Sequence, residues 1–380
     1  MATQLRLTSM VRRKSLNRTK KRAKSGKLLF AFFIKRKWVR LVESTVKDFG
    51  HLENGELVKE FTITNKNGVS LRTISYGATW TGYFVTPEKN IILNFDNVHE
   101  YETNPFHLGN TIGRVAGRLS GHTFNVAGFR VNLKPNENKN VLHSGNTGVD
   151  RLNWHGEIIL DDQFAKIRYT MQQKAIFPGT LEMAVTYSLD EDNHVSVQYE
   201  GRSNVETLFN PMTHVYFNLD GPDAPIKDEF LKIVADRHIV VNEEKIPTGE
   251  IQVVENTPFD FTNLVKLGDQ CEKLGSNEQF DDAFKKPNTS LGVTPSLLLV
   301  DSAKQHQLEM GSDRNGVIIF NVNPDCIGKD ADWLAAHPDN GLAVELQTVP
   351  DAIHHDGFGD IVLPANQTKT YTSTYYYSEG

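Results

Sequence analysis

The sequence predicts an all-β protein, a large antiparallel β-sandwich, and three features of its 380 residues support this fold class. Short apolar runs recur along most of the chain, and clusters of Gly, Pro, Asn and Asp separate them. Several runs alternate apolar and polar residues, which is the pattern of a strand with one buried face. Helical periodicity is rare. Many closely spaced strands with few helices are typical of a sandwich or a barrel.

The clearest strands form a hairpin. Apolar and polar residues alternate over 181–189, turn residues occupy 190–193, and the alternation resumes over 195–199. An alternating run over 167–171 predicts a further strand upstream. The clearest helical signal is short and covers 330–337. Additional strands are expected in five short runs, namely 71–75, 90–95, 230–235, 297–300 and 317–322.

The chain divides into a basic N-terminal extension, residues 1–50, and one acidic domain, residues 51–380. Of the 41 Lys and Arg residues, 14 lie in residues 1–40, where Asp and Glu are absent; the remaining 27 stand against 47 acidic residues. We expect the extension to be disordered. A transit peptide, a nucleic-acid-binding tail or an upstream start codon would leave the same pattern. Its apolar run over 28–34 is far shorter than the ~20 residues that span a bilayer, and no signal-peptide cleavage site follows.

The acidic charge of the main domain bears on its partners. A net negative body disfavours nucleic acid and strongly anionic substrates, and no membrane contact is expected. The two cysteines, Cys271 and Cys326, are too few for a disulfide framework in a chain of this length. They fit a reduced, cytoplasmic location, where we expect a monomer or a homodimer.

A histidine and a glutamate each interrupt an apolar strand. His214 lies within the run 213–219, and Glu345 lies within the run 341–349. A polar group in such a run must be hydrogen-bonded or have a function. Imidazole gains and loses a proton near neutral pH, which suits a general acid or base. Together His214 and Glu345 are a candidate acid–base pair.

Further polar residues stand out as candidates for a functional site. Arg114 and Arg118 lie four apart in a Gly-rich segment, and a guanidinium offers a rigid fork of donors to hydroxyl or carboxylate oxygens. For Arg114 alone, a surface position or a pairing with acids is expected. His143 ends an apolar strand before a glycine turn. Asp281 lies between aromatic residues, where it could accept hydrogen bonds from two vicinal sugar hydroxyls or cap a turn.

The doublet His354-His355 is similar to a metal-binding pair. Adjacent residues on a strand point to opposite faces, however, so a structural role is expected. No His or Cys cluster of the sequence has metal-ligand spacing, and no metal is expected.

Nine short motifs resemble, in the same order, those of the aldose 1-epimerases, also called galactose mutarotases. Each is weak alone, but nine in the family's order, over about residues 55–377, are specific for the superfamily. They are 90–93 with Phe95, 112–116, 142–143 with Gly145, 149–150 with Trp154, 177–179, His214 with 216–219, 246–249, 280–281 with Phe284, and Glu345 with Gln347 and 350–352. The resemblance implies a sandwich of the galactose mutarotase-like type.

The resemblance also implies a chemistry. Glu345 would be the general base and His214 the general acid. The residues implied to hold the sugar are Arg118, His143 and Asp281. The base removes the C1 hydroxyl proton while the acid protonates the ring oxygen, and the same groups close the ring on the other face. No redox change occurs, so no cofactor is expected. The implied activity is interconversion of the α and β anomers of a free aldohexose such as glucose or galactose.

The chain departs from the family pattern around the sugar. Gly117 stands where many members carry asparagine, and it is expected to open space beside Arg118. Ile318 falls near a position where some members have glutamine, and Thr213 and Val215 replace asparagine and serine. These changes leave the acid–base pair intact but alter the expected sugar preference.

Three other functions fit parts of the pattern. A hexose-phosphate 1-epimerase would need a basic cluster, for which the motif offers only Arg114 and Arg118. A non-catalytic sugar-binding protein would not need the acid–base pair. A glycoside hydrolase usually requires two carboxylates, whereas the candidates set into strands are one histidine and one glutamate.

Overall fold

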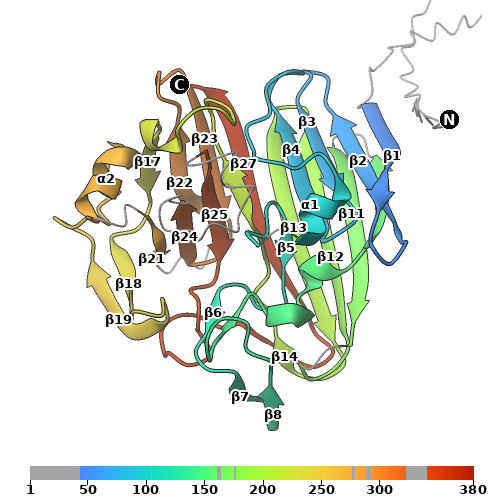
Figure 1. The fold of residues 1–380 in the computed structure, drawn as a ribbon, viewed down its shortest axis with the longest axis vertical. Coiled ribbons are helices and arrows are strands. Elements are labelled where there is room, and N and C mark those ends of the chain that lie inside the picture. The colour runs from blue at the N-terminus through green and yellow to red at the C-terminus, as the bar shows by residue number, and fades with distance from the viewer. Residues whose placement is uncertain are drawn as a thin grey trace, which may run out of the picture.

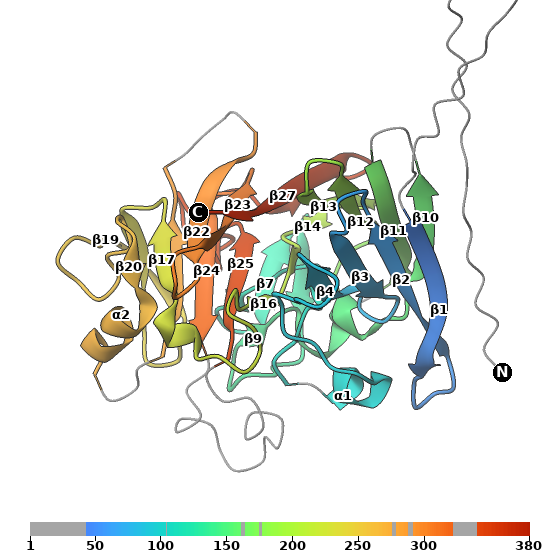
Figure 2. The same cartoon turned by 90° about the horizontal axis from the view of Figure 1, so that it is seen from above.

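The computed structural model describes residues 43–103, 105–160, 164–174, 177–275, 279–287, 292–321 and 340–380. Antiparallel strands dominate this part of the chain, which confirms the all-β prediction. The strands form two layers (Figures 1 and 2). A nine-stranded sheet makes one layer, and a four-stranded and a six-stranded sheet lie side by side in the other. The prediction of a large antiparallel sandwich is thus confirmed.

The nine-stranded sheet extends over both halves of the molecule. In spatial order its strands are β10 (His155–Leu160), β11 (Phe164–Gln173), β12 (Leu181–Asp190), β13 (His194–Ser203), β27 (Thr368–Glu379), β23 (His306–Ser312), β22 (Thr294–Val300), β17 (Phe230–Ile233) and β20 (Val265–Lys266). The long strand β27 joins the two halves because it pairs with β13 on one side and β23 on the other.

Two smaller sheets make the opposite layer. The four-stranded sheet contains β1 (Glu43–His51), β2 (Leu57–Thr64), β3 (Ser70–Ile74) and β4 (Thr79–Phe84). The six-stranded sheet runs β16 (Val215–Phe217), β25 (Leu342–Gln347), β24 (Gly316–Asn321), β21 (Asp281–Lys285), β18 (Arg237–Val241) and β19 (Pro247–Val253). Strand β1 begins at Glu43, so residues 43–50, which the sequence placed in the extension, belong to a sheet.

Short elements complete the described chain. Two-residue to four-residue strands pair as β5 (Thr111–Ile112) with β15 (Met212–Thr213), β6 (Arg118–Leu119) with β9 (Val141–Leu142), β7 (Thr123–Val126) with β8 (Phe129–Asn132), and β14 (Thr207–Leu208) with β26 (Val362–Leu363). The helices are α1 (Val98–Thr103), α2 (Leu267–Lys273), and the single 3₁₀ turns η1 (Gly145–Thr147), η2 (Val149–Arg151) and η3 (Ile226–Asp228). No helix within the described ranges is long and apolar enough to cross a membrane.

Most predicted strands are confirmed. The hairpin is β12 and β13, with Leu189 opposite Val195, and the upstream run is β11. The run 90–95 is an exception, because it forms isolated bridges and no ladder. Ile91 donates its N–H to Tyr83 of β4, whereas Leu93 donates to Tyr216 of β16. A segment that crosses from one sheet to another cannot keep one partner strand. The helical signal over 330–337, residues 1–42 and Cys326 lie outside the described residues.

Trp80 joins the three sheets at the centre of the core. Its fully buried ring lies 5.9 Å from that of Tyr187 and 5.1 Å from that of Tyr375, both on the nine-stranded sheet. It also lies 6.2 Å from the ring of Phe217, on the six-stranded sheet. The three contacts are edge-on, the arrangement that adds about 0.5–1.5 kcal/mol per pair to the burial term. The two layers are therefore fixed relative to each other next to β16, the strand that follows His214.

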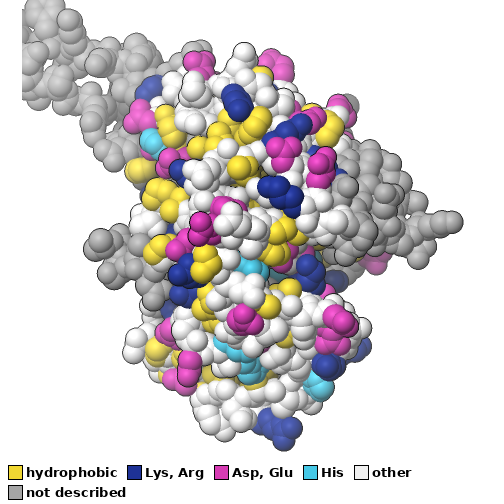
Figure 3. All heavy atoms as spheres, turned by 90° about the vertical axis from the view of Figure 1, so that its left-hand side faces the viewer, with side chains coloured by type: hydrophobic (Ala, Val, Ile, Leu, Met, Phe, Trp, Pro, Cys, Tyr) yellow, Lys and Arg dark blue, Asp and Glu magenta, His cyan; other side chains and the backbone are white. Residues whose placement is uncertain are grey.

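Charged side chains of both signs are interspersed on the face that β18 and β19 border. Figure 3 shows Lys and Arg (dark blue) among Asp and Glu (magenta), with histidines (cyan) near the middle of this face. The described residues visible there form no extended area of positive charge, and a basic patch is the usual footprint of nucleic acid binding.

Candidate active site

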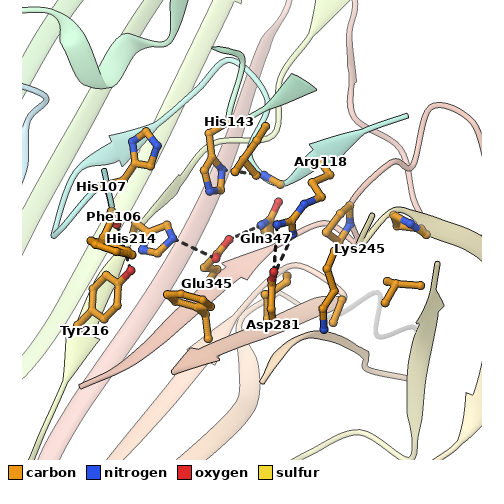
Figure 4. Close-up of a pocket in the computed structure, with 18 of the residues that line it drawn as sticks. Phe106, His107, Arg118, His143, His214, Tyr216, Lys245, Asp281, Glu345 and Gln347 are labelled. Atoms are coloured by element: carbon orange, nitrogen blue, oxygen red, sulfur yellow. Dashed lines mark hydrogen bonds and ion pairs between the residues drawn. The ribbon is translucent and has the colours of Figure 1, made fainter. Parts of the chain in front are cut away.

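A cavity of about 210 Å³ lies over one face of the six-stranded sheet (Figure 4). The five residues singled out from the sequence all line it: Arg118, His143, His214, Asp281 and Glu345. They come from segments that are far apart in the sequence. The fold therefore brings the five together, while their individual roles stay predictions.

The floor of the cavity follows from strand periodicity. Alternate residues of a strand share one face, so Glu345 and Gln347 of β25 point into the same space. Ile318 on β24 lies opposite Glu345 and also opposite Ala283 of β21. The three strands thus supply a polar stripe beside an apolar one. Ile318 lies on the floor of the cavity and offers no hydrogen bond from its side chain. This is what the sequence predicted from an isoleucine near a position where some family members have glutamine.

The candidate acid and base are in contact. Nε2 of His214 lies 3.3 Å from Oε1 of Glu345, and both side chains are more than 90 % buried. Gln347 donates from Nε2 to the other oxygen of Glu345, at 2.8 Å. Asn210 in turn donates to Oε1 of Gln347, at 3.1 Å, which fixes the orientation of that amide. The carboxylate is held by neutral groups, and among the described residues no Lys or Arg pairs with it.

The ring of His214 is oriented by its neighbours. It stacks on Tyr216, two residues along the chain, with ring centroids 5.2 Å apart. Its backbone N–H donates to the carbonyl of Asn110 and its carbonyl accepts from Gly109. Nδ1 has no hydrogen-bond partner among the described residues. Nε2 is the ring nitrogen that has a partner, the carboxylate of Glu345. A proton on Nε2 lets His214 donate a hydrogen bond to that carboxylate.

His143 presents a donor to the cavity. The backbone N–H of Gly117 donates to its Nδ1 at 3.1 Å, so in the neutral ring the proton is on Nε2. Burial lowers the pKa of His143 well below its usual range, and the nearby His107, His214 and Arg118 lower it further. The ring therefore stays neutral at physiological pH and can donate to a sugar oxygen.

Arg118 lies between two carboxylates. It donates from Nε and one terminal nitrogen to Glu137, at 2.7 and 3.0 Å, and from both terminal nitrogens to Asp281, at 3.2 and 3.0 Å. Burial alone would lower the pKa of Arg118, but the carboxylates of Asp281 and Glu137 raise it above its ordinary value. The guanidinium thus holds Asp281 at the cavity (Figure 4), and Glu137 holds the guanidinium.

The expectation for Arg114 was wrong. Its side chain is fully buried, and it pairs with no acid of the described chain. It donates to neutral oxygens of Gln173, Pro178, Gly179 and Thr207, at 2.9–3.1 Å. Burial lowers its pKa to about 10. A sequence reading that treats Arg as a surface charge misses this role, in which five donors tie loops to the sheet.

The expectation that Gly117 opens space was also wrong. Its φ is +73°, which favours glycine, and a Cβ there would lie 2.9 Å from Cβ of Pro350 and 3.3 Å from Oε1 of Gln347. Pro350 therefore already fills the place of a side chain. Glycine is needed for the close approach that lets its N–H reach His143.

Three of the lining residues have the composition of a metal site. His143, His214 and Glu345 bring one possible ligand atom each within 4.8 Å of one another, a grouping that sequence spacing did not reveal. The hydrogen bonds do not fit a metal. The lone pair of His143 faces the N–H of Gly117, and a metal-bound histidine normally donates from its other nitrogen.

The doublet His354-His355 is held by one carboxylate. Asp351, which is fully buried, lies 2.5 Å from Nδ1 of His354 and 3.4 Å from Nε2 of His355. It also accepts the N–H of Ser120, and His355 lies 3.2 Å from the carbonyl of Pro247. These contacts fit the structural role expected for the doublet, since they tie the segment after β25 to β19 and to the loop after β6.

The lining and supporting residues that were missed from the sequence include Gln347, Tyr216, Glu137 and His107. Gln347 had a signal, because it is two residues from Glu345 on the same face of a strand. Tyr216 had the same signal relative to His214. Glu137 and His107 had none, because both lie in irregular segments where no period predicts direction.

The comparisons with known proteins point to one family. Residues 59–376 match the family model described as aldose 1-epimerase. The chain is 34 % identical over 337 residues to a maltose epimerase from Levilactobacillus brevis, an alignment covering 86 % of this chain and 96 % of the relative. It is 32 % identical over 341 residues to an aldose 1-epimerase from Streptococcus thermophilus, covering 86 % and 96 %. It is 29 % identical over 344 residues to galactose mutarotase from Homo sapiens, covering 87 % and 97 %.

Solved structures support the fold. The chain superimposes on a galactose 1-epimerase from Lactobacillus acidophilus with a TM-score of 0.78, covering 89 % of this chain and 99 % of that one at 24 % identity. An aldose epimerase homologue from C. elegans gives a TM-score of 0.73, covering 84 % and 98 % at 23 % identity. From the matched family model and the relatives of more than 30 % identity, the chain belongs to the aldose 1-epimerase family and is an enzyme of the isomerase class.

Proposed function

We propose that the enzyme interconverts the α and β anomers of a free aldohexose, glucose or galactose, with Glu345 as general base and His214 as general acid. The observation that carries the proposal is the buried contact of 3.3 Å between Nε2 of His214 and Oε1 of Glu345 inside the cavity. A proton donor and a proton acceptor at this separation can reach the two oxygens on C1 of one sugar, which are the oxygens that exchange protons in the reaction.

The proton balance closes within the pair. Glu345 takes the proton of the C1 hydroxyl, the bond between C1 and the ring oxygen breaks, and His214 gives a proton to the ring oxygen. The C1 aldehyde then rotates about the C1–C2 bond. Glu345 returns its proton to the aldehyde oxygen, now on the other side, as the ring closes and His214 recovers its own. No electron is gained or lost, which fits the absence of any cofactor in the proposed mechanism.

The hydrogen bond from Gln347 makes the two carboxylate oxygens of Glu345 different from each other. Oε2 accepts from the Gln347 amide, while Oε1 faces His214 and the lumen. A base needs one oxygen with a lone pair directed at the substrate, and a fixed carboxylate needs no reorganisation during proton transfer. Gln347 is thus proposed to orient the base, and Asn210 to orient Gln347.

The charge of the cavity favours a neutral sugar over a sugar phosphate. Arg118 is already paired with both Glu137 and Asp281, so this group of three carries a net negative charge. Lys245, which also lines the cavity, lies 3.8 Å from a carboxylate oxygen of Asp282. A phosphate could pair with Arg118 or Lys245 only by displacing the carboxylates that already contact them. The hexose-phosphate alternative is therefore disfavoured, as is a non-catalytic binder, which needs no acid next to a base.

The sugar preference is proposed to be broad. Ile318 removes one hydrogen-bond partner from the floor, a loss on the order of 0.5–1.5 kcal/mol, or roughly 2- to 13-fold in affinity. Weak discrimination between glucose and galactose follows. One relative is named a maltose epimerase, and maltose is a reducing disaccharide. A reducing disaccharide is thus a further proposed substrate. The enzyme is also proposed to be cytoplasmic and to act as a monomer or a homodimer.

Polarimetry tests the proposal. Freshly dissolved α-D-glucose, α-D-galactose and maltose are followed with wild-type protein and with Glu345→Gln. We expect faster mutarotation of all three with the wild type and the uncatalysed rate with the variant. A preference above about a hundredfold for galactose would contradict weak discrimination. No acceleration of any of the three sugars would contradict the proposed activity itself.

A further inference from the structure

We propose that His107 is a substrate-contacting histidine of the site, whose Nε2 accepts a hydrogen bond from one sugar hydroxyl and so helps to select the substrate. The inference rests on the proposed function, because the ligand is a free sugar. His107 lines the cavity next to two residues already described, with its ring centroid 5.1 Å from that of His143 and 6.2 Å from that of His214 (Figure 4).

Asp150 sets which nitrogen of His107 carries the proton. Nδ1 of His107 lies 3.2 Å from Oδ2 of Asp150. An ionised carboxylate only accepts hydrogen bonds, so Nδ1 has to be the donor and Nε2 of the neutral ring keeps its lone pair. The carboxylate is 95 % buried, and its Oδ1 has no hydrogen-bond partner among the described residues. Burying a carboxylate with so few partners costs stability.

His107 and His143 present opposite hydrogen-bonding groups to the cavity. His143 receives the N–H of Gly117 on Nδ1 and therefore donates from Nε2. His107 donates to Asp150 from Nδ1 and therefore accepts at Nε2. The two rings are close to perpendicular, at 76°. A hydroxyl group is both a donor and an acceptor, so one sugar hydroxyl between the rings would satisfy both histidines.

The segment that carries His107 is fixed to the general acid. The carbonyl of His107 accepts the N–H of Asn110, at 3.0 Å. The next residues pair with His214 in both directions, because Gly109 donates to the His214 carbonyl and His214 donates to the Asn110 carbonyl, at 2.8 and 2.9 Å. The φ of His107 is +52°, a left-handed conformation that side chains other than glycine adopt at a cost and that is often found at functional sites.

The test removes the histidine and the hydroxyl separately. His107→Phe keeps a ring of similar size but cannot accept a hydrogen bond. Rates of mutarotation are measured for glucose and for its 2-, 3-, 4- and 6-deoxy derivatives, with thermal melting as the check on folding. The matched control is His306→Phe. His306 makes the same Nδ1 contact with a buried carboxylate, that of Asp301 at 2.7 Å, but does not line the cavity.

We expect wild type and the His306 variant to lose about 2- to 13-fold in kcat/KM with one deoxy sugar. The His107 variant should be weaker by a similar factor on glucose and lose less than wild type with that same deoxy sugar, because only the hydrogen bond from His143 remains to be lost; this coupling is the signature of a direct contact. Equal losses in all three proteins for every deoxy sugar would overturn the inference. If His107→Phe melts early, His107→Gln, which keeps an acceptor, should restore the selectivity, and its failure to do so would also count against the contact.

Failure of the proposed function would look different. In that case wild-type protein would accelerate mutarotation of none of these sugars. Calorimetric titration of the same sugars into the three proteins then tests the contact through binding alone. One deoxy sugar should raise Kd in wild type and in the His306 variant more than in the His107 variant. Equal changes in Kd in all three proteins for every deoxy sugar would overturn the inference.

Discussion

The two halves of the cavity treat charge in opposite ways. Around His214 and Glu345 both side chains are almost entirely buried, and within the described part of the chain the carboxylate contacts His214 and the neutral amide of Gln347 but no Lys or Arg. Around Arg118 the side chains remain 17–28 % exposed, and each carboxylate is paired with the guanidinium. A carboxylate without a counter-cation is the better proton acceptor, whereas a paired one keeps its place and its charge. If the proposed roles hold, chemistry and substrate binding are separated by the kind of partner that each carboxylate has.

The largest effect should come from the first half. Glu345→Gln keeps the size of the side chain but cannot take a proton, and loss of a positioned acid or base costs ~10²–10⁴-fold. We expect kcat to fall by that factor with a nearly unchanged melting temperature. His214→Asn should be similarly damaging. A folded Glu345→Gln protein with near wild-type polarimetric rates would remove Glu345 from the mechanism and end the distinction between the halves.

A smaller effect of a different kind is expected in the second half. Glu137→Gln weakens the two hydrogen bonds that orient Arg118 but leaves the acid–base pair untouched. KM should rise about 2- to 13-fold, the loss of one hydrogen bond, with kcat nearly constant. Glu200→Gln is the control, because Glu200 pairs with Arg168 at 2.6 Å on the nine-stranded sheet, outside the cavity. A loss in kcat equal to the rise in KM would show that Arg118 takes part in the chemical step.

The pH dependence of stability sharpens the comparison further. The pKa of His143 is lowered in the folded protein, so below the ordinary histidine pKa the unfolded chain binds the proton that the folded chain refuses. Stability must then fall as the pH drops through the unfolded value, about 6.5. His143→Gln should lessen the drop in melting temperature between pH 7 and pH 5. An identical drop in the two proteins would mean that His143 titrates normally when folded.

The smallest effect should come from removing the basic head. Every motif of the family lies beyond it, and the matched family model begins at residue 59. Deleting residues 1–40 should leave rates and melting temperature within experimental error, as measured on the full chain and the truncated one side by side. A large drop in either would show that the apolar run over 28–34 contributes to the domain.

The fold was predictable because its signal is local. Alternation over 181–199 predicts two strands and the turn between them, and both are found in register. The failure over 90–95 has a tertiary cause, since consecutive odd residues there hydrogen-bond to different sheets. A strand-like sequence pattern predicts which side chains of a segment are buried. It does not predict whether the whole segment pairs with a single neighbouring strand.

The site was predictable in its strand residues and less so in its loops. His214, Glu345 and Asp281 lie on or beside strands, where a polar residue in an apolar run is conspicuous. Glu137 and His107 belong to irregular segments, whose side-chain directions depend on individual backbone angles. The error over Gly117 has the same origin, because only the structure shows Pro350 against its Cα.

The position of β27 in the large sheet has a consequence for how the chain assembles. Strands β10 to β13 are contiguous in sequence and can pair as soon as they are synthesised, but the outer edge of β13 waits for β27, which starts only at Thr368. Until then that edge exposes unpaired backbone groups of the kind that join other chains. Pairings so distant in sequence also form slowly. We therefore expect aggregation during synthesis or refolding to begin at β13, and substitutions that weaken β27 to lower the yield of folded protein more than its activity.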